Sequence, residues 1–152
     1  MPNVRIVEWE EKYAPAFIAL SLEWLARYVS VEPADLEIMN NQRAVIDGGG
    51  QIFLALHNDE VVGTVALLKL EAATFELAKL GVTERYKGLK IGRLLMEKGL
   101  DFARKHGAGQ IILYSNRALT PAIGLYEKFG FVEVPVERKK YIEADMKMAL
   151  SL

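Results

Sequence analysis

The stretch ERYKGLKIGRLL, residues 84–95, contains two glycines and four basic residues but no serine or threonine. It lies between an apolar run that ends at Val82 and a helix-like run that begins at Ile91. Where a strand turns into a helix, unpaired backbone N–H groups meet the positive end of the helix dipole. Glycine lets a ligand approach that backbone closely, and the natural guest is a phosphate or pyrophosphate.

Two better-known phosphate loops do not fit this stretch. A P-loop requires GxxxxGK followed by Ser or Thr, whereas the segment GLKIGR has a different spacing and no hydroxyl for magnesium. A dinucleotide-binding fold requires GxGxxG directly after the first strand, but this loop follows the fourth strand that the sequence predicts. Taken alone, the loop leaves two interpretations open: a phosphate site, or a solvated turn whose glycines relieve strain.

The composition predicts one globular domain with a real core, since 51% of the 152 residues are apolar and 26% are charged. A net charge of −1 argues against nucleic acid or an anionic membrane as a partner. The lack of cysteine excludes disulfides, thiol nucleophiles and cysteine-ligated metals. No apolar run is long enough to span a bilayer, and the first residues lack the pattern of a signal peptide. We therefore expect a cytoplasmic protein.

The hydrophobic pattern along the chain predicts the element order β-α-α-β-β-β-α-β-α-β-β. Strands are expected at residues 4–9, 51–56, 61–70, 74–82, 110–115, 131–134 and 141–150. Helices are expected at residues 10–29, from Pro33, at 91–105, and from Pro121 with Thr120 as its N-cap. This order predicts one α/β (α+β) domain, residues 1–152, with a mixed sheet of about seven strands flanked by about four helices.

Three segments resemble the GNAT superfamily of acyl-CoA-dependent N-acyltransferases. The segment KLGVTERYKGLKIGRLLME (79–97) is similar to the family's acetyl-CoA motif, a strand followed by Arg/Gln-x-x-Gly-x-Gly/Ala and a helix. The segment ILYSN (112–116) resembles the next strand, and AIGLYEKFGFVEV (122–134) resembles the late helix with its Leu-Tyr-x-x-x-Gly-Phe signature. One departure is Lys90, which stands at the motif's second Gly/Ala position.

The resemblance implies acetyl-CoA as the acyl donor and cosubstrate, and no metal. Main-chain N–H groups of the loop would hold the pyrophosphate. The loop residues expected at the cofactor are Arg85, Lys87, Gly88, Leu89, Lys90, Ile91, Gly92 and Arg93. Leu80 and Val82 would offer backbone groups to the pantetheine arm as to an added strand, and the Val82 N–H would polarise the thioester carbonyl. Asn116 would contact the cofactor where the fourth and fifth strands splay apart, unless it is only a polar cap on the surface.

For catalysis, the resemblance implies Tyr126 as the general acid that protonates the departing thiolate. A phenol has a reference pKa of about 10, so it is protonated at neutral pH. Tyr126 also lies on the apolar stripe of its helix, so a core tyrosine is the alternative. Glu76 matches the position of a general base, and a solvent-facing strand glutamate is the alternative there. Weaker candidates for the base are Glu23, Glu71 and Tyr141.

The function that the resemblance implies is transfer of an acetyl group from acetyl-CoA to a primary amine of a small molecule, an amino acid or a peptide. Attack is expected to be direct, in a ternary complex, because no Cys or Ser is placed for a covalent acyl-enzyme. A non-catalytic acyl-CoA sensor or regulatory subunit is the main alternative, and an unrelated nucleotide-phosphate binder is a weaker one. Homodimers are common among relatives, so a homodimer is a further expectation.

Overall fold

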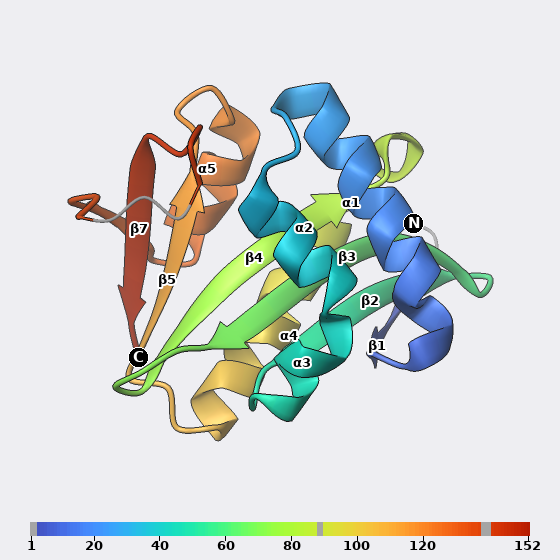
Figure 1. Cartoon of the computed structure of the whole chain (residues 1–152), viewed down its shortest axis with the longest axis horizontal. Coiled ribbons are helices and arrows are strands. Elements are labelled where there is room, and N and C mark those ends of the chain that lie inside the picture. The colour runs from blue at the N-terminus through green and yellow to red at the C-terminus, as the bar shows by residue number, and fades with distance from the viewer. Residues whose placement is uncertain (1–2, 88–89, 138–140) are drawn as a thin grey trace.

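The computed structural model describes residues 3–87, 90–137 and 141–152 (Figure 1). Within them the chain forms seven strands and five α-helices. The strands are β1 (Arg5–Glu8), β2 (Gln51–His57), β3 (Glu60–Lys69), β4 (Thr74–Val82), β5 (Gln110–Ser115), β6 (Val132–Val134) and β7 (Met146–Ser151). The helices are α1 (Ala14–Tyr28), α2 (Pro33–Asn40), α3 (Gln42–Asp47), α4 (Ile91–Lys105) and α5 (Thr120–Lys128). Two short 3-10 turns, η1 (Glu11–Tyr13) and η2 (Glu84–Tyr86), precede α1 and α4.

The strands form one mixed sheet in the order β1-β2-β3-β4-β5-β7-β6. Every pair of neighbouring strands is antiparallel except β4 and β5, which are parallel. The parallel pair follows from the chain path, because α4 crosses over one face of the sheet between the two strands. The expected mixed sheet of seven strands is therefore confirmed.

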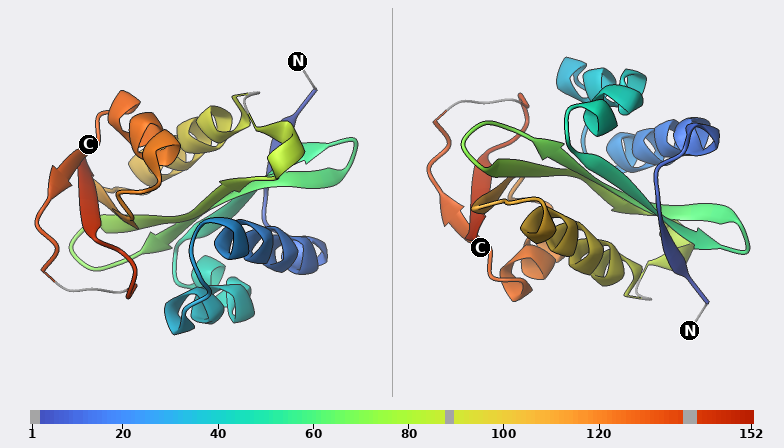
Figure 2. Two further views of the ribbon diagram at one scale, coloured as in Figure 1. Left: turned by 90° about the horizontal axis from the view of Figure 1, so that it is seen from above. Right: turned by 90° about the horizontal axis from the view of Figure 1, so that it is seen from below.

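Helices cover both faces of the sheet (Figure 2). The helices α1, α2 and α3 lie on one face, while α4 and α5 lie on the other. The strands are apolar on both sides for this reason: on β2, Ile52 and Leu54 face the first group of helices, and Phe53 and Ala55 face the second. This alternation gives one hydrophobic cluster on each face of the sheet.

The gap between β4 and β5 is the feature of the fold that creates a site. The two strands pair only over three residues, from Thr74↔Gln110 to Glu76↔Ile112. Beyond that point β4 continues to Val82 and β5 continues to Ser115 without pairing with each other. Figure 1 shows the two strands diverging from their shared end. The sheet is therefore split at the carboxyl ends of β4 and β5.

Several expected boundaries differ from the structure. Helix α3 was not predicted, and it brings the number of α-helices to five instead of about four. The expected helix 10–29 is divided into η1 and α1, with Pro15 in the first turn of α1. Thr120 is the first helical residue of α5 and makes no capping hydrogen bond, so the predicted N-cap was wrong by one residue. The last strand begins at Met146, because Tyr141–Asp145 form a loop and not a strand.

Candidate active site

A β-bulge interrupts β4 beside the gap. The pairing of β3 with β4 shifts between Thr64↔Gly81 and Ala66↔Ala78, which leaves one extra residue on β4. Lys79 lies there with a positive φ of 55°, an unusual conformation for a residue other than glycine. Ala78 packs against the cluster under α1–α3, and the Lys79 ammonium pairs with Asp35 of α2, so both side chains point to the same face.

The bulge also sets the direction of the backbone at the end of β4. The Thr83 N–H donates to the Val62 carbonyl of β3 at 2.9 Å. Because backbone groups of successive residues in a strand point to opposite edges, those of Leu80 and Val82 point away from β3, into the gap. Their side chains pack instead against the cluster under α4. This geometry supports the expectation that Leu80 and Val82 present main-chain groups to an extended ligand arm.

A groove of about 800 Å³ begins at this edge and runs between the N-terminus of α4 and α5. Of the described residues that line it, four are basic and none is acidic. These basic residues are Lys87, Lys90, Arg93 and Lys128. Helix α4 begins without a side-chain cap, so the first-turn N–H groups and the positive end of its dipole face the groove. This set of donors fits the phosphates of CoA.

The structure places most of the predicted cofactor residues in this groove. Leu80, Val82, Lys87, Lys90, Ile91, Gly92 and Arg93 line it. Gly88 and Leu89, also predicted here, lie outside the described residues. Arg85 does not line the groove, because its exposed guanidinium forms an ion pair with Glu60. That pairing with Glu60 raises the pKa of Arg85. A contact of its side chain with the cofactor is therefore not supported by the geometry.

Lys90 occupies the N-cap of α4 in the left-handed region, with φ 63° and ψ 18°. This conformation explains why glycine suits the position, since a Cβ is strained there. We expect Lys90→Gly to raise the free energy of unfolding by roughly 0.5–1 kcal/mol. Urea denaturation measures this. Lys90→Ala keeps the Cβ and so serves as the control, and an equal gain in both variants would contradict the explanation.

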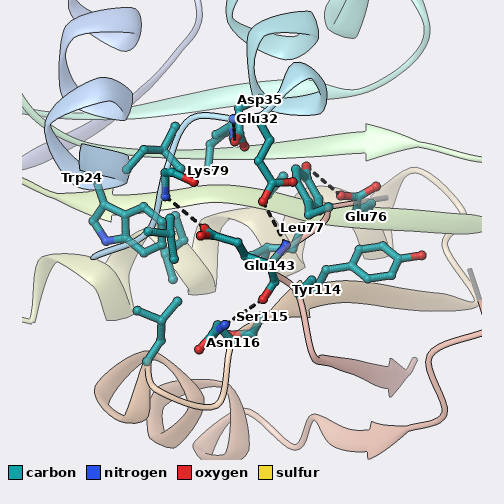
Figure 3. Close-up of a pocket in the computed structure, with 18 of the residues that line it drawn as sticks. Trp24, Glu32, Asp35, Glu76, Leu77, Lys79, Tyr114, Ser115, Asn116 and Glu143 are labelled. Carbon is teal, nitrogen blue, oxygen red and sulfur yellow. Dashed lines mark hydrogen bonds and ion pairs between the residues drawn. The ribbon is translucent and has the colours of Figure 1, made fainter. Parts of the chain in front are cut away.

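A second cavity, of about 110 Å³, opens between β4 and β5 on the side of α1 and α2 (Figure 3). Aromatic side chains and carboxylates line it. The aromatic residues are Trp24, Tyr114, Tyr126 and Tyr141, and the acidic ones are Glu32, Asp35, Glu76 and Glu143. Leu80 lines both this cavity and the groove. The two hollows therefore meet at the end of β4.

Tyr126, on α5, reaches this cavity from the far side of the sheet. Its side chain is only 8% exposed and its ring packs against Phe131, as expected of a core tyrosine. Among the described residues, none accepts a hydrogen bond from its hydroxyl. Burial raises the pKa of Tyr126 to about 12, so the hydroxyl keeps its proton at neutral pH. Tyr126 is therefore a core residue that also lines the cavity and carries a protonated hydroxyl.

Glu76, on β4, lines the same cavity and belongs to the last residue pair that joins β4 to β5, Glu76↔Ile112. It is 2% exposed, so the alternative of a solvent-facing strand glutamate is wrong. The Tyr141 hydroxyl donates to its carboxylate over 3.4 Å. Burial and, secondarily, the nearby Glu76 raise the pKa of both Tyr114 and Tyr141, so these phenols remain protonated donors around it.

The three weaker candidates for the base differ in whether they line the cavity. Glu23 accepts hydrogen bonds from the Thr83 hydroxyl and the Glu84 N–H and does not line the cavity. Glu71 lies in the turn before β4, away from the gap. Tyr141 does line the cavity, as a donor to Glu76. Of the residues that the sequence suggested as the base, only Glu76 and Tyr141 line the cavity.

Asn116 lines the cavity at the end of β5, but both ends of its amide have protein partners. Its nitrogen donates to the Glu143 carbonyl at 2.7 Å, and its oxygen accepts from the Ala118 N–H at 2.9 Å. The alternative of a polar cap thus describes its observed bonds. A contact between Asn116 and the cofactor remains a prediction.

Several residues of the cavity were missed by reasoning from the sequence. The ion pair between Lys79 and Asp35 is buried, with side chains 7% and 5% exposed. Lys79 is the first residue of the segment that resembles the acetyl-CoA motif, but no role was assigned to it, and Asp35 belongs to no motif. The lysine inside a mostly buried strand was the one available signal, because a buried ammonium requires a partner. Ser30 and Ser115 also line the cavity, where no serine was expected.

The comparisons with known proteins agree with this geometry. The model of the Acetyltransferase (GNAT) family matches residues 6–131. Mycothiol acetyltransferase of Corynebacterium glutamicum is 36% identical over 73 residues, which are 48% of this chain and 25% of that protein. The chain spans about a quarter of the length of the first curated relatives that it matches.

Solved structures show the same fold. An acetyltransferase of the GNAT family from Staphylococcus aureus Mu50 superposes with a TM-score of 0.89 at 23% identity, covering 98% of this chain and 99% of that one. YncA of Salmonella typhimurium, solved with its cofactor acetyl-CoA, has a TM-score of 0.80 at 17% identity and covers 97% and 93%.

The chain belongs to the GNAT family of acetyltransferases. The expected family and fold are therefore confirmed, and the names of the relatives agree with the expected class of acyltransferase. In the part of the chain that the structure describes, no helix has the length and apolar character needed to cross a bilayer.

Proposed function

We propose that this protein transfers an acetyl group from acetyl-CoA to a primary amine of a small molecule, an amino acid or a peptide. The observation that carries the proposal is the meeting of a basic groove and a separate acid- and tyrosine-lined cavity at Leu80. A donor in the groove and an acceptor in the cavity would face each other across the end of β4. Family membership supports the same reaction.

The groove and the edge of β4 would hold acetyl-CoA, which supplies the acetyl group. First-turn N–H groups of α4 and the Lys90 ammonium suit its phosphates. Lys87 also lines the groove, but its ammonium forms an ion pair with Glu84 and donates to the Tyr28 hydroxyl. Backbone groups of Leu80 and Val82 point into the gap and suit its amide-containing arm. The Val82 N–H would then donate to the carbonyl oxygen on which charge develops.

On the acceptor side, Glu76 takes the proton that an amine must lose before it attacks, since an alkylammonium has a pKa of about 10. The Tyr126 hydroxyl gives its proton to the departing sulfur. Its raised pKa keeps it in the acid form that this role requires. Glu76 comes from β4 and Tyr126 from α5, and both line the cavity, so the reacting groups would lie between them.

Direct attack is favoured over a covalent route. Ser30 and Ser115 line the cavity, but neither of the two histidines, His57 and His106, does. A serine nucleophile needs an adjacent base, which in most hydrolases is histidine. The proposed transfer therefore runs without a covalent acyl-enzyme, with donor and acceptor bound together.

The test is release of a free thiol from acetyl-CoA, measured with a panel of primary amines: alkylamines, amino acids, an aminoglycoside and short peptides. We expect thiol release that depends on both the protein and one class of amine, with the acetylated product seen by mass spectrometry. Binding of acetyl-CoA without transfer to any amine would favour the non-catalytic sensor. Tighter binding of ADP than of CoA would favour an unrelated nucleotide-phosphate site.

Other expectations from the sequence remain predictions. They are a homodimer, a cytoplasmic location, no metal cofactor, and neither nucleic acid nor membrane as a partner.

A further inference from the structure

We infer that Glu32 is a positioning residue for the acceptor half of the reaction, and this inference rests on the proposed function. Glu32 lies immediately before α2, and its side chain is 7% exposed. It fastens the loop before β7 across the gap between β4 and β5. This loop, residues 141–145, is the part of the expected last strand that the structure shows not to be a strand.

The Glu32 carboxylate binds the backbone of that loop through both oxygens. One oxygen accepts the Ile142 N–H, and the other accepts the Glu143 N–H at 2.9 Å. These partners are 110 and 111 residues away along the chain. Hydrogen bonds to an ionised carboxylate are roughly twice as strong as neutral ones. A single side chain of the N-terminal half thus holds two consecutive amides of the C-terminal half.

The loop also makes contacts of its own, through Glu143, with the N-terminal half and with the residue after β5. The Glu143 carboxylate accepts the Ser30 N–H at 3.0 Å, and the Glu143 carbonyl accepts from the Asn116 amide. Figure 3 shows these bonds beside one another at the cavity. The end of α1, the start of α2 and the end of β5 are therefore joined through one short loop.

Glu32 is itself held to β4. Its own N–H donates to the Asp35 carboxylate at 2.9 Å, and Asp35 forms the buried ion pair with Lys79 at the bulge. The chain of bonds runs from β4 through α2 and the loop to β5. These residues form part of the wall of the cavity on the acceptor face.

The residue that this arrangement positions is Tyr141, at the start of the loop. Tyr141 precedes the two amides held by Glu32, and its hydroxyl donates to Glu76. Releasing the loop would move Tyr141 away from the proposed base and remove Glu143 and Ala144 from the cavity wall. The groove is built from other residues, so acetyl-CoA binding should not change.

The test compares Glu32→Gln with Glu37→Gln, an exposed glutamate on the same helix. Glutamine presents an N–H donor where one carboxylate oxygen accepted, so one of the two loop bonds is lost. We expect hydrogen exchange at the Ile142 and Glu143 amides to accelerate roughly tenfold. The acceptor KM should rise by a similar factor, while the dissociation constant of acetyl-CoA stays within about twofold. Glu37→Gln should change none of these.

If Glu32→Gln does not fold, Glu143→Ala provides the second test, since Glu143 is exposed and only the bond to Ser30 is lost. It should also raise the acceptor KM, by a smaller factor than Glu32→Gln. Unchanged amide exchange in Glu32→Gln, or faster exchange with an unchanged acceptor KM, would overturn the inference. If the wild type transfers no acetyl group, the proposed function fails and the positioning role with it. The amide exchange would still show whether Glu32 holds the loop.

Discussion

Replacing Tyr126 with phenylalanine should lower kcat by roughly 10²–10⁴ and leave the dissociation constant of acetyl-CoA nearly unchanged. The ring fills the same space against Phe131, so the fold keeps its core. Only the hydroxyl is lost, and with it the proton for the departing sulfur. Steady-state kinetics with a saturating amine, together with a calorimetric titration of acetyl-CoA, measure the two quantities.

Tyr13→Phe is the matched control, because Tyr13 lies in η1 and packs on the α1 face, outside the cavity and the groove. It should have wild-type kinetics. Because the pKa of Tyr126 is raised to about 12, the wild-type rate should show no loss of this acid between about pH 6 and 9. A kcat in Tyr126→Phe within a factor of about three of the wild type would assign Tyr126 to the core alone.

The second large effect is expected for Glu76→Gln, which should lower kcat/KM by roughly 10²-fold near neutral pH. The amide cannot accept the proton of the incoming ammonium. As the pH rises toward the amine pKa of about 10, more acceptor enters already neutral, so the deficit should shrink. The measurement is the pH dependence of kcat/KM for the acceptor in wild type and variant.

Glu8→Gln, at an exposed position on β1, is the control for that series and should follow the wild type at every pH. A deficit in Glu76→Gln that stays constant with pH would indicate that Glu76 supports the structure of the cavity and is not the base. If Glu76→Gln lowers kcat/KM at no pH, another group must act as the base.

The elements that local pattern determines were predicted closely. Helix α4 was expected at residues 91–105 and is found there, because a long apolar stripe repeats at helical spacing and Gly107, with φ 82°, follows its end. Strand β5 likewise has the expected bounds, because its apolar run is bounded by polar residues and glycine. Helix α3 was missed because its six residues are too few to show a periodicity.

Features that depend on contacts between distant residues could not be predicted from the sequence. The bulge at Lys79 shows in the sequence only as a lysine inside a strand, and its partner Asp35 lies 44 residues earlier. The loop before β7 has the residues of a strand, yet its amides are taken by Glu32 instead of a neighbouring strand. Whether these amides bind a carboxylate or a neighbouring strand depends on the tertiary structure and not on the β-propensity of the segment.

In the candidate site too, some residues could be predicted from the sequence, and others depend on distant contacts. The resemblance to the family was enough to single out Tyr126, through its motif, and Glu76, through its position on the strand, and the structure brings both to one cavity. Arg85 was assigned by motif alone, and its side chain turns to Glu60 on the surface, where nothing in the local sequence foretold the pairing. The carboxylates of Glu32 and Glu143 come from loops whose positions only the tertiary fold defines.

The thermal midpoint with and without acetyl-CoA, with ADP as the control ligand, tests the central claim most directly. Ligand at about a hundred times its dissociation constant stabilises the folded state by about 2.7 kcal/mol. For a chain of this size the midpoint should rise by roughly 5–10 °C, with a much smaller rise for ADP. No rise at millimolar acetyl-CoA would mean that the groove beside Lys90 does not hold the donor. The roles proposed for Tyr126 and Glu76 would then be contradicted as well.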